Sequence, residues 1–470
     1  MLNRFVTRIH RYAVKRLANG ATRLYVQNAD ALQQSGLLKN CRVSLSFKRG
    51  RIEATLDKNG THKIMDTARG ELFELKNKDT TKALGDAQFV TITFRTGKLI
   101  ITIHGMDEAQ QKREQRIIDN LLSGKPLRTA CLFSGLGMLS YWIKQGLALQ
   151  GIKTEICFAN DMDELAMSCN LAGNPMWENA TADASAVVDS LNALHLYDLP
   201  QSDFVTIGYP CVGQSSLATE ENRDLNHPTV GTLFVPLVNA LRRMNPGLFI
   251  IENTPRFGAS ETLSLLQRSM PDYNFTQRVF DGHDYNELES RKRVAIIAVS
   301  KGLPAMDLSD IPSQFNNEPV RTVNDILEPM PLDAACWDEM AHVKARDNMK
   351  HLGYRNCLYF GDETKMVTIP ASYGPRKAGT PMIAHPETPE LQRQVMPNEH
   401  ANLRELPGTL KSQVMKVWKG THPLVSKRGS FSAANRLLGN GVSRRIWTSM
   451  GAALGLHLLS AATQPDTLAA

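Results

Sequence analysis

Five short apolar segments, separated by stretches of helical length, are the feature that most constrains how this 470-residue chain can fold. They are residues 130–133, 155–159, 204–208, 248–252 and 294–299, and each has the length of one buried strand. Strands that alternate with helices form βαβ units, which align the strands in parallel within one sheet. The spacing therefore predicts an α/β domain with a parallel sheet, and the chain is long enough for further domains.

Residues suited to a nucleotide-like ligand follow the first two predicted strands. The first strand opens into a turn with Phe133, Gly135 and Gly137, where glycines let a ligand approach the backbone beside a helix N-terminus. The second strand ends at Asp161, and a carboxylate at such a position typically binds ribose hydroxyls. A glycine turn alone can serve packing only, but the two features together predict a site for an adenosine-containing cofactor.

Reactive residue types follow the other strands. Cys211 comes directly after the third strand, Glu252 ends the fourth, and Arg291 and Arg293 precede the fifth. In open α/β sheets, ligands bind at the carboxyl ends of the strands, which makes a nucleophile and an acid possible there. Considered one at a time, a buried small cysteine, a glutamate that caps a loop and a solvated basic run are equally good interpretations.

The identity and order of these segments resemble the DNA cytosine-5 methyltransferase family from Thr129 to the C-terminus. The chain departs from that pattern at Glu289, where the family commonly has Gln, and at Met138, where it often has a second Gly. The matching motifs are Phe133-x-Gly135-x-Gly137, Asp161 and Asp163 with Ala166 and Asn170, Thr181-Ala182-Asp183, Pro210-Cys211, Gly231-Thr232-Leu233-Phe234, Glu252-Asn253, Glu289-x-Arg291-x-Arg293, the group Arg393, Pro397, Glu399, Leu403 and Pro407, and Arg436-x-x-Gly439-Asn440-Gly441-Val442.

The resemblance implies an activity and a role for each catalytic residue. The chain would transfer a methyl group from S-adenosylmethionine to carbon 5 of a flipped-out cytosine in a specific duplex DNA sequence, through a covalent Cys211 adduct. Glu252 would bond ring nitrogen 3, while Arg291 and Arg293 would position the base and keep Cys211 reactive by lowering its pKa. The residues implied in cofactor binding are Phe133, Gly135, Leu136, Gly137, Asp161, Met162, Asp183, Gly208, Pro210, Leu233, Asn440 and Val442.

The resemblance also implies a domain plan: a Rossmann-like methyltransferase core with a small target-recognition insert, preceded by a β-rich N-terminal domain. We expect an N-terminal domain at 1–125, the catalytic core at 126–300, the recognition domain at 301–395 and a C-terminal return to the core at 396–470. Within the insert we expect residues 368–374 to face DNA. Further phosphate and base contacts are expected from Arg346, Lys350, Arg355, Lys365, Arg376, Lys377, Tyr354, Tyr359 and Tyr373.

The N-terminal region is basic and repetitive. Residues 1–128 contain 24 Lys and Arg against 12 Asp and Glu, which suggests a module that meets a polyanion. Residues 20–105 form two similar copies, each with a strand, a polar stretch and two alternating strands around a basic turn (Lys48 to Arg51, and Arg95 to Lys98). Before them, Leu2, Phe5, Ile9 and Leu17 predict one face of a helix. A folding or dimerisation module is the alternative to DNA binding.

Composition restricts the remaining possibilities. The seven cysteines contain no CxxC pair, so we predict no metal site and no disulfide framework, and a cytoplasmic setting. No apolar run is long enough for a membrane helix. We expect double-stranded DNA as the partner of a monomer and a nucleoid-associated protein of prokaryotic or mobile-element origin, of the restriction-modification type. A tRNA cytosine-5 methyltransferase and a DNA-binding regulator on an inactive scaffold remain open.

Overall fold

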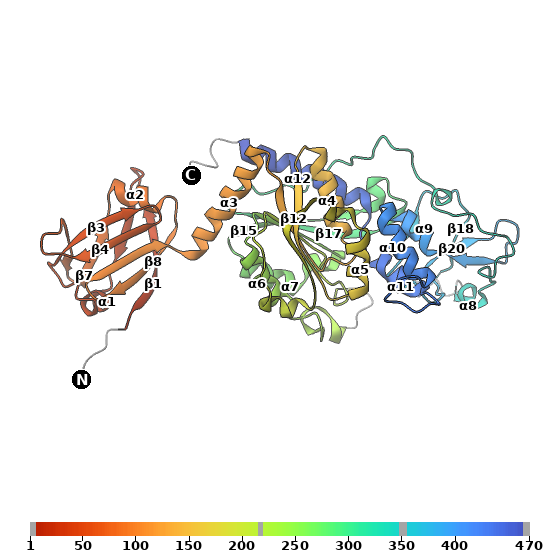
Figure 1. Ribbon diagram of the computed structural model, residues 1–470, viewed down its shortest axis with the longest axis horizontal. Helices are drawn as coiled ribbons and strands as arrows, with labels where there is room; N and C mark the ends of the chain where they lie inside the picture. Colours follow the sequence, from red (N-terminus) through yellow and green to blue (C-terminus); the bar gives the residue numbers. More distant parts are fainter. Residues whose placement is uncertain (1–5, 215–219, 347–354, 464–470) are drawn as a thin grey trace. The chain divides into compact units, whose positions relative to one another are not determined.

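The computed structural model describes residues 6–214, 220–346 and 355–463, and the chain divides into two compact units. The first unit reaches Lys112, and the second runs from Arg113 to Thr467. The boundary falls within α3 (Gly105–Ser123), the polar helix in which both units are joined along the chain (Figure 1).

The N-terminal unit is built on one nine-stranded sheet in the order β5-β3-β4-β9-β8-β1-β2-β7-β6, in which every pair is antiparallel. Its apolar core includes Leu24, Phe73 and Phe94, all without solvent exposure. The strands are β1 (Arg8–Arg16), β2 (Thr22–Val26), β3 (Arg42–Lys48), β4 (Arg51–Leu56), β5 (His62–Lys63), β6 (Met65–Thr67), β7 (Gly70–Leu75), β8 (Phe89–Arg95) and β9 (Lys98–Ile103).

The predicted duplication is present, and each copy is a β-α-β-β unit. The polar stretch of each copy is a short helix, α1 (Ala29–Gln34) or α2 (Lys78–Leu84), capped by the side chain of Asn28 or Asn77. Each hairpin turn bonds the helix end of the other copy: Gly50 N–H donates to the Ala83 carbonyl at 2.7 Å, and Gly97 N–H donates to the Ser35 carbonyl at 2.7 Å. The copies therefore fold as one domain.

The helix predicted for the start of the chain is wrong over the described residues. Residues 8–16 form β1, which pairs with β8 and then with β2, whereas Leu2 and Phe5 lie outside the described residues. The segment contains Ile9, Tyr12 and Val14, which suit a strand. Helical spacing of apolar residues is only weak evidence for a helix, so hydrogen bonding to β8 decides that this segment is a strand.

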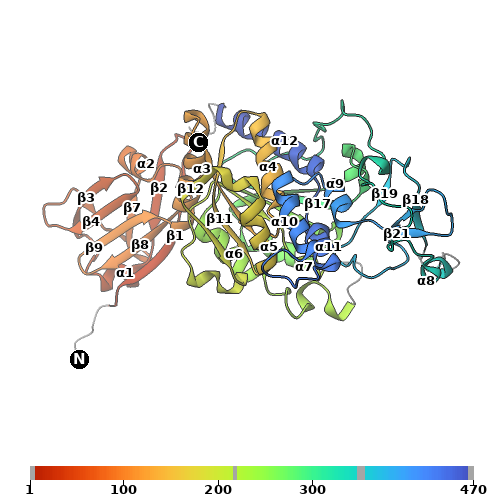
Figure 2. The same ribbon diagram turned by 45° about the vertical axis from the view of Figure 1, so that its right-hand side comes forward.

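The second unit contains a seven-stranded sheet in the order β12-β11-β10-β13-β14-β17-β15 (Figure 2). The first five strands in this order are parallel, and the predicted α/β core is confirmed. The strand predicted at 294–299 is present as β17, but it runs antiparallel to both β14 and β15, so the parallel direction expected for this one strand is wrong. The strands are β10 (Leu127–Leu132), β11 (Thr154–Asp161), β12 (Ala180–Val188), β13 (Phe204–Ile207), β14 (Leu248–Asn253), β15 (Tyr273–Asp281) and β17 (Lys292–Ser300).

The reversed direction of β17 has a consequence for the site. An antiparallel strand begins where its parallel neighbours end, and Val294 of β17 pairs with Asn253 at the end of β14. Arg291 and Arg293 therefore come to the carboxyl edge of the sheet, next to Glu252.

Helices cover both faces of this sheet. One apolar core holds α6 (Phe234–Met244) and α7 (Glu261–Ser269), and the other holds α4 (Met138–Leu149), α5 (Glu164–Gly173) and the long α12 (Arg444–Thr463). Helix α12 packs along α4 (Figure 2). The remaining helices of the C-terminal return are α9 (Pro397–Leu403), α10 (Gly408–Lys419) and α11 (Phe431–Asn440).

The insert after β17 has little regular structure but has its own apolar core, which includes Val323, Ile369 and Tyr373. Its strand β19 (Met366–Val367) pairs in parallel with β16 (Glu289–Ser290), which immediately precedes Arg291. The other elements of the insert are α8 (Ala341–Lys344), β18 (Cys357–Tyr359), β20 (Pro381–Ala384) and β21 (Gln392–Gln394).

Candidate active site

The glycine turn after β10 has a backbone that few residues other than glycine adopt readily. Gly135 and Gly137 have φ of +51° and +75°, and Phe133 has φ of +53°. A Cβ on Gly135 would meet no atom within 4 Å, so this side of the turn is open. Gly208, at the end of β13, lies so close to this turn that a Cβ added to it would be 2.8 Å from the Phe133 carbonyl oxygen. The ends of β10 and β13 thus meet at the turn.

Two asparagines hold the glycine turn in place. The Nδ2 of Asn170, from α5, donates to Ser134 Oγ and to the Gly135 carbonyl, both at 3.0 Å. The Nδ2 of Asn174 donates to the Leu136 carbonyl at 2.7 Å. The turn is therefore pre-organised, and Asn174 is a supporting residue that the sequence motifs did not indicate.

Asp161 lies against this turn at the end of β11. Its carboxylate accepts the Gly135 N–H at 2.7 Å and the Asp163 N–H at 2.9 Å. Burial raises the pKa of Asp161, while these N–H donors act in the opposite direction. The neighbouring Met162 is 75% exposed, which presents an apolar side chain at the same edge.

The structure does not bring Asp183 to this edge. Asp183 lies within β12 on the amino side of Ser185, which pairs with Phe158, and it forms an ion pair at 3.2 Å with Arg128 near the start of β10. The carboxyl end of β12 is Val188, opposite Asp161, and the next residue is Asp189. The Asp189 carbonyl accepts the Asn160 amide at 2.8 Å, and its carboxylate accepts the Tyr197 hydroxyl at 2.9 Å. Sequence reasoning missed Asp189 because the weakly apolar β12 was not predicted as a strand.

Cys211 follows β13 after Pro210; the residue as a whole is exposed, whereas its sulfur lies among groups that reduce its solvation. Glu252, Arg291 and Arg293 lie close enough to change the pKa of its thiol. That pKa is raised, first by the reduced solvation of the sulfur and then by the Glu252 charge, and the two arginines offset only part of the rise. The two arginines thus lower the pKa of the Cys211 thiol as expected, but burial and the Glu252 charge outweigh them in the protein alone.

Glu252 is held at the end of β14 by an ion pair. Arg293 Nε lies 2.8 Å from Glu252 Oε1, and both side chains are largely buried. The adjacent Asn253 donates from Nδ2 to the Tyr209 carbonyl at 3.0 Å, which ties the Glu252 strand to the segment that carries Cys211. The cysteine, the carboxylate and the guanidinium thus form one cluster.

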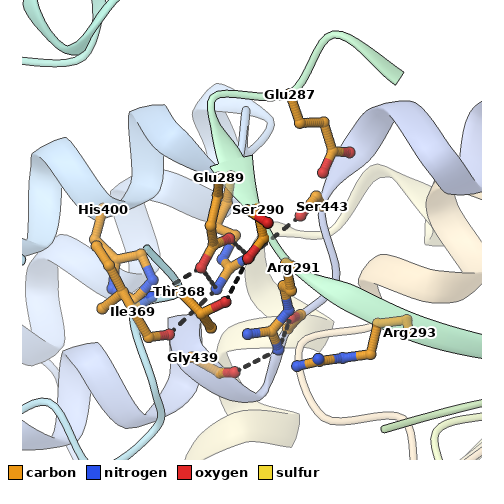
Figure 3. A network of polar contacts seen from close by, with 12 residues as sticks. Glu287, Glu289, Ser290, Arg291, Arg293, Thr368, Ile369, His400, Gly439 and Ser443 are labelled. Carbon is orange, nitrogen blue, oxygen red and sulfur yellow. Dashed lines mark hydrogen bonds and ion pairs between the residues drawn. The ribbon is translucent and has the colours of Figure 1, made fainter. Parts of the chain in front are cut away.

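Arg291 is buried and bonds the last sequence motif. Its Nη2 donates to the carbonyls of Gly439 at 2.9 Å and Gly441 at 3.1 Å, on either side of the exposed Asn440 (Figure 3). A Cβ on Gly441 would lie 3.9 Å from the Met138 side chain. The loop that carries Asn440 therefore lies next to the first turn of α4, which begins just after the glycine turn.

The other predicted cofactor residues are mainly packed. Leu136, Leu233 and Val442 are buried in the two apolar cores on either side of the sheet or at their margin. Their side chains shape the walls around the turn, while polar groups for a ligand come from Asp161, Asp189 and backbone N–H groups.

The insert differs from its predicted role at several residues. Tyr359 and Tyr373 are buried in the core of the insert, and the Tyr373 hydroxyl accepts the Val395 N–H at 2.9 Å. Ile369 is also buried, so residues 368–374 are only partly exposed. These side chains are buried because an insert with little regular structure depends on its aromatic and apolar side chains to form a core. Lys350 and Tyr354 lie outside the described residues.

The residues at this edge suit S-adenosylmethionine. An open glycine turn, the carboxylates of Asp161 and Asp189, and the exposed apolar Met162 offer hydroxyl acceptors and a contact for a flat ring. Among the residues that the structure describes, no three His, Cys, Asp or Glu side chains lie close enough together to hold a metal ion. Over the same described ranges, no helix is long and apolar enough to cross a bilayer.

Comparison with known proteins gives a family match and distant relatives. Residues 127–419 match the model of the C-5 cytosine-specific DNA methylase family. The chain is 23% identical over 221 residues to the type II methyltransferase M.HgiCI of Herpetosiphon aurantiacus, which covers 43% of this chain and 49% of that protein. It is 26% identical over 203 residues to M.Eco47II of Escherichia coli, with 42% and 45% covered. The chain thus spans about half the length of these curated relatives.

Solved structures share the fold of the second unit. The Dnmt2 methyltransferase of S. pombe aligns with a TM-score of 0.52 and 18% identity, covering 71% of this chain and 98% of that structure. The methyltransferase EhMeth of Entamoeba histolytica aligns with a TM-score of 0.50 and 16% identity, covering 72% and 98%. At this level of identity the likeness concerns the fold.

Proposed function

Because the chain belongs to the C-5 cytosine-specific DNA methylase family, we propose that it methylates carbon 5 of a cytosine in duplex DNA, with S-adenosylmethionine as the donor. The family predicted from the motifs is confirmed by the match over residues 127–419. The observation that carries the proposal is the cluster of Cys211, Glu252 and Arg293 at the sheet edge that also holds the glycine turn.

The cluster suits covalent activation of a cytosine ring. The Cys211 sulfur would form a bond to carbon 6, and the electron pair of the ring would move towards nitrogen 3, where Glu252 would deliver or share a proton. Arg293 holds the Glu252 carboxylate in position through their 2.8 Å contact. Burial and the Glu252 charge raise the pKa of the Cys211 thiol, so the thiol would have to give up its proton before or as the bond to carbon 6 forms, and the charges of Arg293 and Arg291 favour that loss.

The cofactor would lie between the glycine turn and the ends of β11 and β12. S-adenosylmethionine, when bound, supplies an electrophilic methyl group. Asp161 would accept ribose hydroxyls, since its carboxylate is fixed by two N–H donors. Asp189 would take the role that the sequence motif gave to Asp183, because it follows the end of β12 opposite Asp161, and Met162 would cover one face of the adenine ring. A base would then take the proton from carbon 5, and the electron pair of that C–H bond would restore the 5–6 double bond as the bond from carbon 6 to the Cys211 sulfur breaks.

The N-terminal unit supports DNA as the partner. The strand register places alternate residues of β1, β3, β4, β8 and β9 on the sheet face that points away from the core. This face carries several cations and the carboxylate of Glu53. The pKa of Glu53 is lowered to about 2 because Lys98 and Arg51 both bond it. Cations on this outer face include Arg11, Lys15, Arg42, Lys48, Arg51, Arg95 and Lys98. Such a face suits a phosphate backbone.

Bisulfite sequencing of DNA from cells that express the chain tests the proposed reaction. Protected cytosines within one short sequence are expected for the wild type, and the Cys211→Ser variant should protect none while it still binds S-adenosylmethionine. If the folded wild type binds S-adenosylmethionine but protects no DNA cytosine, methylation of tRNA or a regulatory role without catalysis replaces the proposal.

A further inference from the structure

Glu289 is a buried carboxylate with one partner in the insert and another at the end of α9. Its side chain is 2% exposed and lies in β16, directly before Ser290 and Arg291. Glu289 Oε1 accepts the Ile369 N–H from the insert at 2.8 Å and an Nη2–H of Arg404 at 3.1 Å. Its Oε2 accepts an Nη1–H of the same arginine. Both carboxylate oxygens are therefore engaged.

The insert is attached to the core at this point by several further bonds. Strand β19 pairs with β16, with Met366 opposite Glu289 and Val367 opposite Ser290. Thr368 Oγ1 donates to the Ser290 carbonyl at 2.8 Å. The insert segment 366–369 thus lies along the two residues that precede Arg291, with its backbone register set by Glu289.

Arg404 completes the attachment from the C-terminal end of α9. It has no solvent exposure, and besides Glu289 it donates to Ser443 Oγ at 3.2 Å and to the Ile369 carbonyl at 3.4 Å. A buried charge that loses its partner is strongly destabilised, so Glu289 and Arg404 depend on each other.

The same charges act on Arg291. Arg291 is buried, and the neighbouring Arg293 and Arg404 disfavour its positive charge, whereas Glu289 and Glu252 favour it. Arg291 in turn bonds the carbonyls on both sides of Asn440. A continuous set of contacts therefore runs from the insert, through Glu289, to the loop beside the glycine turn.

We propose that Glu289 is a positioning residue that couples the seating of insert residues 366–369 to the placement of Arg291 and of the loop 439–441. The insert would reach its docked register only when Glu289 bonds both Arg404 and the Ile369 N–H. The same arrangement would keep Arg291 bound to the Gly439 and Gly441 carbonyls. The effect of this coupling on catalysis rests on the proposed function, whereas the structural link itself can be tested without any reaction.

Hydrogen–deuterium exchange of the full-length protein, without DNA or cofactor, tests the link directly. Glu289→Gln should accelerate amide exchange at least about tenfold both at residues 366–369 and at residues 439–442. Thr368→Ala, which removes one hydroxyl and no charge, should accelerate both segments by a smaller factor. It provides the test if Glu289→Gln does not fold.

The control is Asp203→Asn, which removes a carboxylate from another buried ion pair of the second unit. Asp203 has no solvent exposure, and its Oδ1 accepts the Arg116 Nε–H at 2.6 Å. Its Oδ2 accepts the Asn120 amide at 3.0 Å and the Arg128 N–H at 2.9 Å. Among the bonds of the described residues, none joins the Asp203 side chain to Arg404 or to segments 366–369 and 439–441. Asp203→Asn should leave exchange at 439–442 within about twofold of the wild type. Unchanged exchange at 439–442 in Glu289→Gln, or an equal change in Asp203→Asn, would overturn the coupling.

A kinetic measurement connects the link to catalysis. On a duplex that carries the sequence found by bisulfite sequencing, Glu289→Gln should lower kcat about 10- to 100-fold per active site, because small misplacements of reacting groups have effects of this size. Active sites are counted by covalent trapping on 5-fluorocytosine DNA, so a smaller amount of folded protein does not lower the value. An unchanged kcat with faster exchange would overturn the catalytic part of the proposal.

Discussion

Arg293 Nε lies 2.8 Å from Glu252 Oε1, and both charges act on the Cys211 thiol. The Glu252 charge raises the pKa of the thiol, and the Arg293 charge lowers it. The pair therefore restrains the acid of the proposed reaction and also sets how readily the nucleophile loses its proton.

The first prediction concerns this pair. Glu252→Gln should lower the pKa of Cys211, and Arg293→Gln should raise it, because each variant removes one of two opposite charges. The rate of Cys211 alkylation by iodoacetamide is measured against pH by mass spectrometry of the Cys211 peptide. Shifts of the midpoint in the same direction for both variants would contradict the assignment. Alkylation of the half-buried Cys41 serves as the internal reference.

A second prediction distinguishes the aspartates that would bind S-adenosylmethionine from the one that would not. Asp161→Ala and Asp189→Ala should each weaken S-adenosylmethionine binding about tenfold or more, since a hydrogen bond to a charged group contributes about 1.5–3 kcal/mol. Asp183→Ala is the matched control, because Asp183 pairs with Arg128 away from the glycine turn. Calorimetric titration of the three variants decides between the two positions. A weaker affinity in Asp183→Ala alone would restore the role that the sequence motif indicated.

A third prediction follows from Glu287, a buried carboxylate that lies at the N-terminal end of α12. Its Oε1 accepts the N–H groups of Arg445 and Ile446, but burial raises its pKa from 4.5 to about 7. The folded protein therefore keeps this proton between pH 4.5 and 7 while the unfolded chain loses it, so stability falls as pH rises through that window.

Glu287→Gln should flatten this dependence. At about 1.36 kcal/mol per pKa unit, the contribution reaches up to about 3 kcal/mol at pH 8. The variant should be as stable as the wild type near pH 4.5 and more stable at pH 8, as measured by thermal unfolding. A variant less stable than the wild type at pH 8 would show that the capping bonds to α12 outweigh the burial of charge.

The last prediction tests the outer face of the N-terminal sheet. Replacing Lys48 and Arg95 with Gln should reduce the slope of log affinity against log salt for duplex DNA, by up to about 0.9 for each phosphate that the protein no longer neutralises. Lys76 and Lys78, at the N-terminal end of α2 and outside these strands, provide the control replacements. Equal slopes for the wild type and both double variants would show that this face does not bind the DNA backbone.

Much of the fold was predictable because it depends on local patterns. The apolar segments at 130–133, 204–208 and 248–252 correspond to β10, β13 and β14, and the duplicated N-terminal unit follows from its repeated alternation. Strand β12 was missed because residues 180–188 are mostly small, with Thr181, Asp183 and Ser185 among alanines, and none is fully buried, so they lack the signal of a buried strand. That omission also hid Asp189.

The sequence by itself determined which reactive residues this protein has and in what order: Cys211 after a strand, Glu252 at the end of the next, and glycines where the backbone must turn. The tertiary structure alone decided how they meet. The antiparallel direction of β17 depends on pairing between residues distant in the chain, and it brings Arg293 to Glu252. Likewise, the bond of Glu289 to Arg404 spans 115 residues, a separation over which no local pattern carries information.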